Sequence, residues 1–192
     1  MFTHYIDVGR LEMICGPMFS GKSEELIRRL KRTMLAGQKT IVFTPSIDDR
    51  YLKDNICSHD GKYLEAISIS NSEEILMHVS NDTQVIGIDE VQFLDGNTVS
   101  IIMDLVSQGK RVVCGGLDKD FKAESFGFIP ELLALADDVT KLTAICVCCG
   151  RPANFTQRLI EGRAASYKDP IILIGASESY EARCRLCYEI DK

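Results

Sequence analysis

Residues 16–23 constrain this chain more than any other stretch, and they read Gly16, Pro17, Met18, Phe19, Ser20, Gly21, Lys22 and Ser23. The run fits G-x-x-x-x-G-K-[ST], in which glycines let the backbone turn tightly and aim N–H groups at phosphate oxygens. We expect Lys22 to reach the β- and γ-phosphates and the Ser23 hydroxyl to bind Mg²⁺. Residues 11–15 read as a buried strand and residues 23–36 as a helix, so the phosphates would meet a helix N-terminus. The motif therefore predicts a P-loop.

The composition bounds the class of protein. The 192 residues suit one domain with an appendage or two small domains, and 45% hydrophobic residues suffice for a core. No apolar run approaches the roughly 18 residues of a membrane span, and the N-terminus lacks the pattern of a signal peptide. We therefore expect a cytoplasmic protein. A net charge of −6 and a pI near 5.1 argue against broad binding of nucleic acid or membrane through a basic surface.

Short apolar runs alternate with helical patterns over the first 143 residues. Strands are predicted at 39–44, 85–89 and 111–115, helices at 72–79, 97–108 and 129–136, and a last strand at 139–145. This alternation predicts βαβ units and an α/β fold with a parallel sheet covered on both faces. The polar stretch 45–63 is predicted to be a long loop. We place a domain boundary near residue 144, which gives a P-loop α/β domain at 1–143 and a second domain at 144–192.

A second acidic site follows the strand at 85–89. Residues 86–90 resemble a Walker B strand, in which the acid at the strand end faces Mg²⁺. Asp89 and Ser23 would supply the oxygen ligands that a hard cation prefers. Glu90 would then lie at the carboxyl edge of the sheet and accept the proton of an attacking hydroxyl or water. The alternative is that Glu90 caps the next helix or pairs with a lysine.

The eight cysteines include two C-x-x-C pairs. Each pair places two thiolates within reach of one tetrahedral Zn²⁺, and the four predicted ligands are Cys146, Cys149, Cys184 and Cys187. The interval between the pairs is longer than the usual spacing of about 15–20 residues, which indicates a zinc ribbon with an enlarged loop. Cys148 offers a third thiol beside the first pair, and an error of one residue stays open. A redox C-x-x-C is the alternative, which the presence of two pairs disfavours.

These residues together resemble the cytosolic-type (type II) thymidine kinases. The resemblance runs over nearly the whole chain, and it is carried by the motifs 16–23, 89–93, 116–118 with Phe121 and Phe126, 141–144 and the paired cysteines with 184–187. It implies a RecA-like α/β domain with a small zinc domain, and ATP-dependent phosphorylation of the 5′-hydroxyl of thymidine and deoxyuridine in nucleotide salvage for DNA synthesis. It also implies a homotetramer and feedback inhibition by thymidine triphosphate.

The resemblance also assigns residues. Glu90 matches the catalytic base, Ser23 and Asp89 the Mg²⁺ environment, and Lys22 the phosphate lysine. Arg50 matches an arginine near the phosphates, and the ATP site includes residues 16–23 with Asp89, Glu90, Val91 and Gln92. The loop between the cysteine pairs corresponds to a lasso over the base. The implied nucleoside positions are Met18, Phe93, Leu117, Phe121, Phe126, Ile171, Ile172, Leu173, Ile174, Gly175 and Tyr180.

Two departures from the family pattern are the extra thiol of Cys148 and Gly175-Ala176, which stands in place of a glycine pair. A thymine ring has flat apolar faces, so aromatic and methionine side chains suit it. Core packing remains the alternative for each phenylalanine, loop filling for Met18, and buttressing of the zinc lobe for Tyr180. Two other functions are a P-loop ATPase or GTPase switch and a zinc-ribbon nucleic-acid binder. No N-K-x-D guanine motif occurs, which disfavours a GTPase and leaves an ATPase open. Residues 141–192 carry eight Lys/Arg against six Asp/Glu, which disfavours the nucleic-acid binder.

Overall fold

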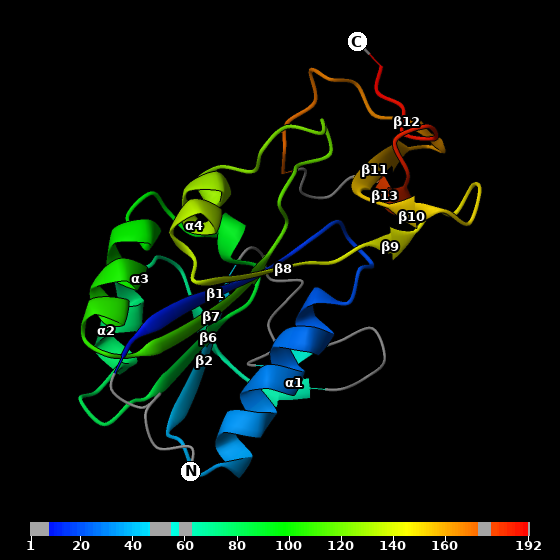
Figure 1. Cartoon of the computed structure of the whole chain (residues 1–192). Helices are drawn as coiled ribbons and strands as arrows, with labels where there is room; N and C mark the ends of the chain where they lie inside the picture. Colours follow the sequence, from blue (N-terminus) through cyan, green and yellow to red (C-terminus); the bar gives the residue numbers. More distant parts are fainter. Residues whose placement is uncertain (1–7, 47–54, 58–62, 173–177, 192) are drawn as a thin grey trace.

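The computed structural model describes residues 8–46, 55–57, 63–172 and 178–191. Its centre is a six-stranded sheet in the order β5-β2-β6-β7-β1-β8, and every pairing between these strands is parallel (Figure 1). The strands are β1 (Arg10–Cys15), β2 (Thr40–Pro45), β5 (Ile67–Ile69), β6 (Val85–Ile88), β7 (Arg111–Gly116) and β8 (Asp138–Lys141). The predicted α/β class with a mostly parallel sheet is confirmed.

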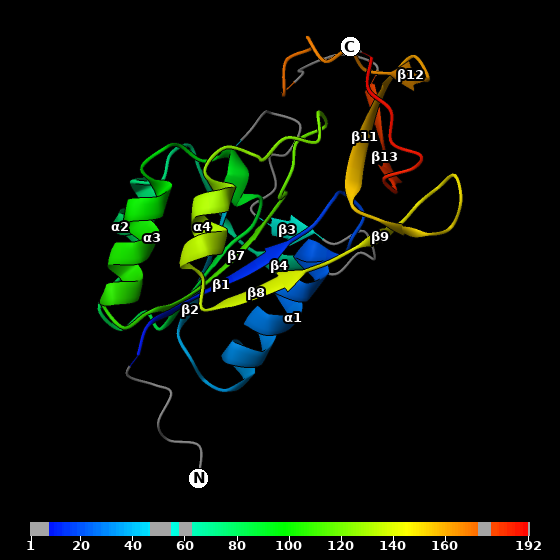
Figure 2. The ribbon, with the colours of Figure 1, turned by 45° about the horizontal axis from the view of Figure 1, so that its top comes forward.

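Helices cover both faces of this sheet. Helix α1 (Lys22–Leu35) packs on one face, and α2 (Glu74–His78), α3 (Thr98–Ser107) and α4 (Ile129–Leu135) pack on the other (Figures 1 and 2). Successive residues of a strand point to opposite faces, so each strand can contribute side chains to the hydrophobic core on either face of the sheet. In β1, Leu11 and Met13 join the core under α2, α3 and α4, whereas Ile14 joins the core under α1. Within the described residues, no helix is long and apolar enough to span a membrane.

Two contacts fix α1 against the sheet. A Cβ at Gly87 of β6 would lie 2.4 Å from Leu30 Cδ1, so the glycine lets α1 pack directly on this strand. Glu12 of β1 is buried and accepts from the guanidinium groups of Arg29 on α1 (2.7 Å) and Arg111 on β7 (2.6 Å). Because a buried carboxylate is costly without cationic partners, these pairs set how the helix lies on the strands.

The predicted strand at 139–145 is wrong as a single element. The chain leaves the sheet after β8, where Leu142 donates from its N–H to the Cys15 carbonyl at 2.8 Å. It then forms β9 (Ala144–Ile145), which pairs antiparallel with β10 (Pro152–Ala153). The break falls beside the predicted boundary at residue 144, and the division into two domains stays a prediction.

The residues after β9 lie beyond the carboxyl ends of the central strands (Figures 1 and 2). They form a second antiparallel sheet in the order β12-β11-β13, from β11 (Phe155–Ile160), β12 (Arg163–Ala164) and β13 (Glu178–Arg183). A further antiparallel pair, β3 (Asn55–Cys57) with β4 (Tyr63–Glu65), lies within and just after the predicted long loop. A 3₁₀ turn, η2 (Val91–Phe93), follows β6.

Candidate functional site

The loop from β1 to α1 requires glycine at both ends. Gly16 has φ 150°, and a Cβ there would lie 2.6 Å from the Leu142 carbonyl oxygen. Gly21 has φ 83° and immediately precedes α1. Only a residue without a side chain adopts both conformations at low cost. The predicted strand, turn and helix are therefore present. The N-terminus of α1 lies at the carboxyl edge of the sheet, because α1 begins shortly after β1 ends.

Lys22 folds back over this loop. Its ammonium group donates to the Pro17 carbonyl at 2.8 Å, and the residue is only 7% exposed. Burial lowers the pKa of Lys22, although the nearby carboxylates of Glu90 and Asp89 act in the opposite direction. The loop thus holds a poorly hydrated cation opposite two acids.

The predicted partners Ser23 and Asp89 do come together. The Ser23 hydroxyl hydrogen-bonds the Asp89 carboxylate, which is 5% exposed at the end of β6. Burial, followed by the charge of Glu90, raises the pKa of Asp89 to about 7. A Cβ at Gly115 of β7 would lie 2.9 Å from Asp89 Oδ1, so the neighbouring strand leaves room for this carboxylate.

Glu90 has a left-handed backbone with φ 48°, a sparsely populated conformation for a residue with a side chain. Its side chain does not cap the turn η2. Instead, Oε2 accepts from Gln92 Nε2 at 2.6 Å, and Gln92 Oε1 accepts the N–H of Leu117 at 3.0 Å. A Cβ at Gly116 would lie 2.6 Å from Gln92 Oε1. Gln92 therefore links the Glu90 carboxylate to the end of β7.

The apolar residues predicted around a nucleoside divide into two groups. Phe93 and Phe126 meet edge to face with ring centroids 5.5 Å apart, and Phe126 also packs against the core under α3 and α4. Leu117 and Phe121 are buried beyond the end of β7. Core packing thus accounts for part of the environment of Phe126, and the role of each residue toward a ligand stays a prediction.

Two residues of β11 that sequence reasoning missed lie near these groups. The Thr156 hydroxyl oxygen accepts the N–H of Met18 at 3.0 Å, which joins β11 to the loop before α1. The Arg158 guanidinium carbon lies 3.9 Å from the centre of the Phe121 ring, and Arg158 Nε donates to the Tyr180 hydroxyl at 3.1 Å. No motif marks either residue, because their importance arises from strands that are distant in sequence.

The remaining predicted residues of the nucleoside and ATP sites are only partly described. Ile171 and Ile172 are 43% and 48% exposed. Arg50, Leu173, Ile174 and Gly175 lie outside the described residues.

Asp118 forms a charged cluster that the sequence did not predict. Its Oδ2 contacts the ammonium groups of Lys119 at 2.6 Å and Lys141 at 2.8 Å. Although burial acts to raise the pKa of Asp118, these two cations hold it below its ordinary value. This cluster ties the ends of β7 and β8 together beside the loop that begins at Gly16.

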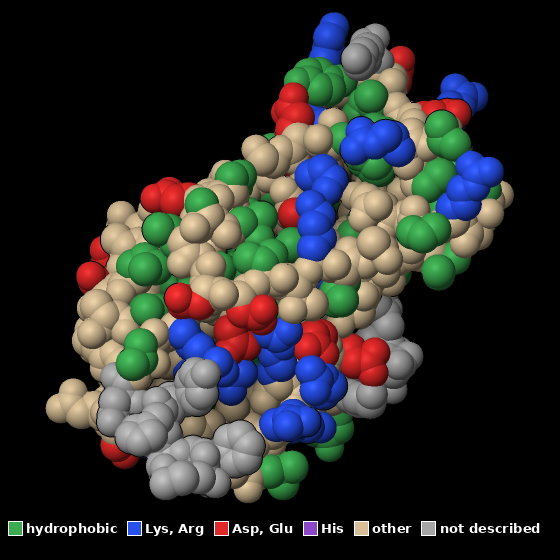
Figure 3. Space-filling view, viewed as in Figure 1, with side chains coloured by type: hydrophobic (Ala, Val, Ile, Leu, Met, Phe, Trp, Pro, Cys, Tyr) green, Lys and Arg blue, Asp and Glu red, His purple; other side chains and the backbone are tan. Residues whose placement is uncertain are grey.

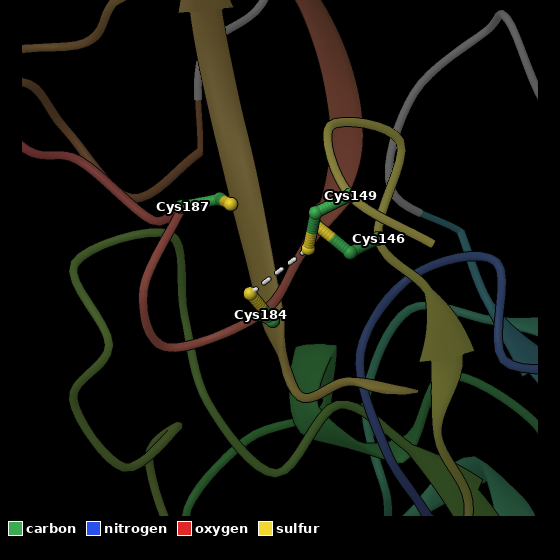
Figure 4. A group of neighbouring side chains, drawn as sticks. All are labelled: Cys146, Cys149, Cys184 and Cys187. Carbon is green, nitrogen blue, oxygen red and sulfur yellow. Dashed lines mark hydrogen bonds between the residues drawn. The ribbon is translucent and has the colours of Figure 1, made fainter. Parts of the chain in front are cut away.

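Four cysteine sulfurs converge between the turn that joins β9 to β10 and the residues that follow β13 (Figure 4). The Sγ atoms of Cys146, Cys149, Cys184 and Cys187 all lie within 4.8 Å of one another. Cys149 and Cys184 are 3.6 Å apart. Tetrahedral zinc with bonds of about 2.3 Å requires sulfurs about 3.8 Å apart, so this group fits Zn²⁺. Cys148 is exposed and outside the group, which favours the two-residue spacing.

The environment of Cys146 also favours a thiolate ligand. Burial opposes its ionisation, but the backbone N–H groups of Cys184, Cys148 and Cys149 outweigh burial and lower the pKa of Cys146 to about 6. By contrast, the neighbouring thiols raise the pKa of Cys187 to about 12. Four thiolates at this separation require a dication among them, which is the charge that zinc supplies.

We predict that Cys149→Ser abolishes zinc binding and that Cys148→Ser does not. Cys149 supplies one of four convergent sulfurs, whereas Cys148 lies outside the group. Zinc content by atomic emission should be about one ion per chain for the native protein and for Cys148→Ser. The reverse pattern, with zinc lost only from Cys148→Ser, would show that the ligand is Cys148.

We also predict that Asp89→Asn gains stability over the native protein as the pH rises. The pKa of Asp89 is raised to about 7 in the folded protein from an ordinary 3.8, so folding favours its protonated form. Its contribution is full below about pH 4, declines as the pH rises toward 7 and is level above that. Thermal unfolding of both proteins from pH 4 to 8 without added Mg²⁺ measures the difference. Parallel curves would contradict the raised pKa.

The chain was compared with models of protein families. The family model described as thymidine kinase matches residues 9–188, which is most of the chain.

Proposed function

Because the chain belongs to the thymidine kinase family and is therefore a phosphotransferase that phosphorylates thymidine, we propose that ATP is the donor and that residues 16–23 bind its phosphates. The observation that carries the proposal is the convergence of Lys22, Ser23, Asp89 and Glu90 at the carboxyl edge of one parallel sheet. Ligands bind at this edge in open α/β folds.

The phosphates would lie against the N-terminus of α1. Gly16 and Gly21 let the loop turn its N–H groups inward, and the helix dipole favours an anion at this end. The Lys22 ammonium group donates to the neutral Pro17 carbonyl in this structure, and it would donate to phosphate oxygens instead when ATP binds. Such charge-assisted hydrogen bonds are about twice as strong as neutral ones.

Ser23 and Asp89 would hold Mg²⁺. A hydroxyl and a carboxylate are the oxygen ligands that this cation takes, and the two already meet through a hydrogen bond. Bound Mg²⁺ would neutralise charge on the β- and γ-phosphates. Asp89 has room because Gly115 has no side chain.

Glu90 would accept the proton of the acceptor hydroxyl. Gln92 holds one of its carboxylate oxygens at 2.6 Å, and we assign the other to the 5′-hydroxyl. Positioning and charge neutralisation would supply most of the rate enhancement, as in other phosphoryl transfers.

The base would lie among Met18, Phe93, Leu117 and Phe121, with Tyr180 and the 171–172 backbone nearby. The apolar faces of a pyrimidine suit such side chains, and deoxyuridine, which lacks only the ring methyl, would also be accepted. Thr156, through its contact with Met18, would set the distance between this pocket and the phosphate loop.

The finer family properties are proposals as well: a homotetramer, feedback inhibition by thymidine triphosphate, a cytoplasmic location and a role in nucleotide salvage. A nucleic-acid-binding function is disfavoured by the charge distribution. On the face drawn in Figure 3, acidic side chains are interspersed with Lys and Arg over α1, where Arg28 and Arg29 pair with Glu25. Phosphate backbones require a more uniform basic stripe.

A panel of nucleosides with Mg-ATP tests the substrate proposal. We expect 5′-monophosphate from thymidine and deoxyuridine and none from cytidine or purine nucleosides. ATP hydrolysis without a phosphorylated nucleoside would instead indicate a switch or motor ATPase.

We predict that Glu90→Gln loses turnover and keeps ATP binding. Loss of a general base costs about 10²–10⁴ in rate. Single-turnover rates with thymidine, alongside calorimetric titration with ATP, measure the two effects. Glu131→Gln, an exposed change on α4, is the control and should retain the native rate. Native turnover by Glu90→Gln would rule out this base.

A further inference from the structure

Arg158 is the largest fully buried side chain among the described residues, and it is 1% exposed. All three nitrogens of its guanidinium group donate hydrogen bonds. Nε donates to the Tyr180 hydroxyl at 3.1 Å, Nη1 donates to the Pro170 carbonyl at 2.6 Å, and Nη2 donates to the Ile171 carbonyl. Its plane also covers Phe121, with the guanidinium carbon 3.9 Å from the ring centre.

These partners come from three segments that are distant in sequence. Phe121 follows β7, Pro170 and Ile171 follow β12, and Tyr180 lies on β13 directly across from Arg158. Phe121, Ile171 and Tyr180 belong to the residues proposed around the nucleoside, whereas Arg158 does not. One side chain on β11 therefore contacts several parts of the proposed pocket.

Only arginine suits this arrangement. Its planar guanidinium group directs several N–H donors in fixed directions and stacks on an aromatic ring, whereas a lysine ammonium is a compact point charge. Removing a cation from water costs several kcal/mol unless acceptors compensate. Since the carbonyls of Pro170 and Ile171 are such acceptors, burial of Arg158 is coupled to the position of the 170–171 backbone.

The same face of β11 also reaches the phosphate loop. Side chains two residues apart share one face of a strand, so Thr156 lies on the face of Arg158. Thr156 accepts the Met18 N–H at 3.0 Å. Strand β11 thus contacts the phosphate loop through Thr156 and the 170–171 segment through Arg158.

We propose that Arg158 is a positioning residue for the nucleoside, because its guanidinium group fixes the 170–171 backbone against Tyr180 and Phe121. This inference rests on the proposed function. Arg158 would act by positioning residues that contact the nucleoside, without contacting the reacting atoms itself. Loss of the guanidinium fork should weaken binding of thymidine far more than binding of the ATP phosphates. Its hydrogen bonds hold the 170–171 backbone and Tyr180, whereas Lys22 and Ser23 bond to Pro17 and Asp89.

The test is the kinetics of Arg158→Lys, which keeps the charge and removes the fork. We expect the KM for thymidine to rise about tenfold to hundredfold, from the loss of hydrogen bonds to a charged group. The KM for ATP should stay within about twofold of the native value on the same reasoning, since its contacts are untouched. Arg163→Lys, an exposed change on β12 in the same sheet, is the matched control and should leave both values unchanged.

Arg158→Gln covers the case in which a buried lysine prevents folding. Glutamine is neutral, so its burial costs less, and it retains one N–H donor group. Zinc content and thermal unfolding establish that each variant is folded. A parallel rise of both KM values, or no change in either, in a folded variant would overturn the inference. If the native protein phosphorylates no nucleoside, the proposed function fails instead, and the two failures are distinguishable.

Discussion

The close approach of β7 to the residues after β6 is the constraint on which the candidate site depends. Gly115 and Gly116 lie beside Asp89 and Gln92, and a Cβ at either glycine would fall within 2.9 Å of a side-chain oxygen. Because parallel neighbours end at the same edge of a sheet, a side chain at Gly115 or Gly116 would displace Asp89 or Gln92, which follow β6. Because neither glycine has a side chain, the Asp89 carboxylate can lie near Ser23, and Gln92 can lie where it donates to Glu90.

Burial then determines the electrostatics of the site. Asp89 and Lys22 are both removed from water, which raises the pKa of the acid and lowers the pKa of the base. Each shift reflects a charge that is more costly here than in solution. On our proposal, Mg²⁺ and phosphate would replace the lost hydration. The β12-β11-β13 sheet adds to this arrangement through Thr156 on Met18. The segment that follows β13 adds the Tyr188 hydroxyl, which donates to the Phe121 carbonyl at 2.6 Å.

Much of this arrangement could be predicted from local patterns. The glycines of the loop, the apolar runs of β1, β2, β6 and β7 and the paired cysteines each encode their geometry within a few residues. Non-local elements were missed. The three residues of β5 are too short for a periodic pattern, and the break between β8 and β9 depends on the Leu142 contact with Cys15. The choice of Cys149 over Cys148 likewise required the positions of the second pair.

The sequence by itself determined the α/β class, the loop at 16–23, the acids at 89 and 90 and the two cysteine pairs, because spacing along the chain carries that information. Only the tertiary structure decided which side chains surround them. Gln92 on Leu117, Thr156 on Met18 and Arg158 on Phe121 and Tyr180 join segments from different strands. Two of these three contacts arise where a second sheet lies over the end of the first, and no local pattern in the chain encodes that contact.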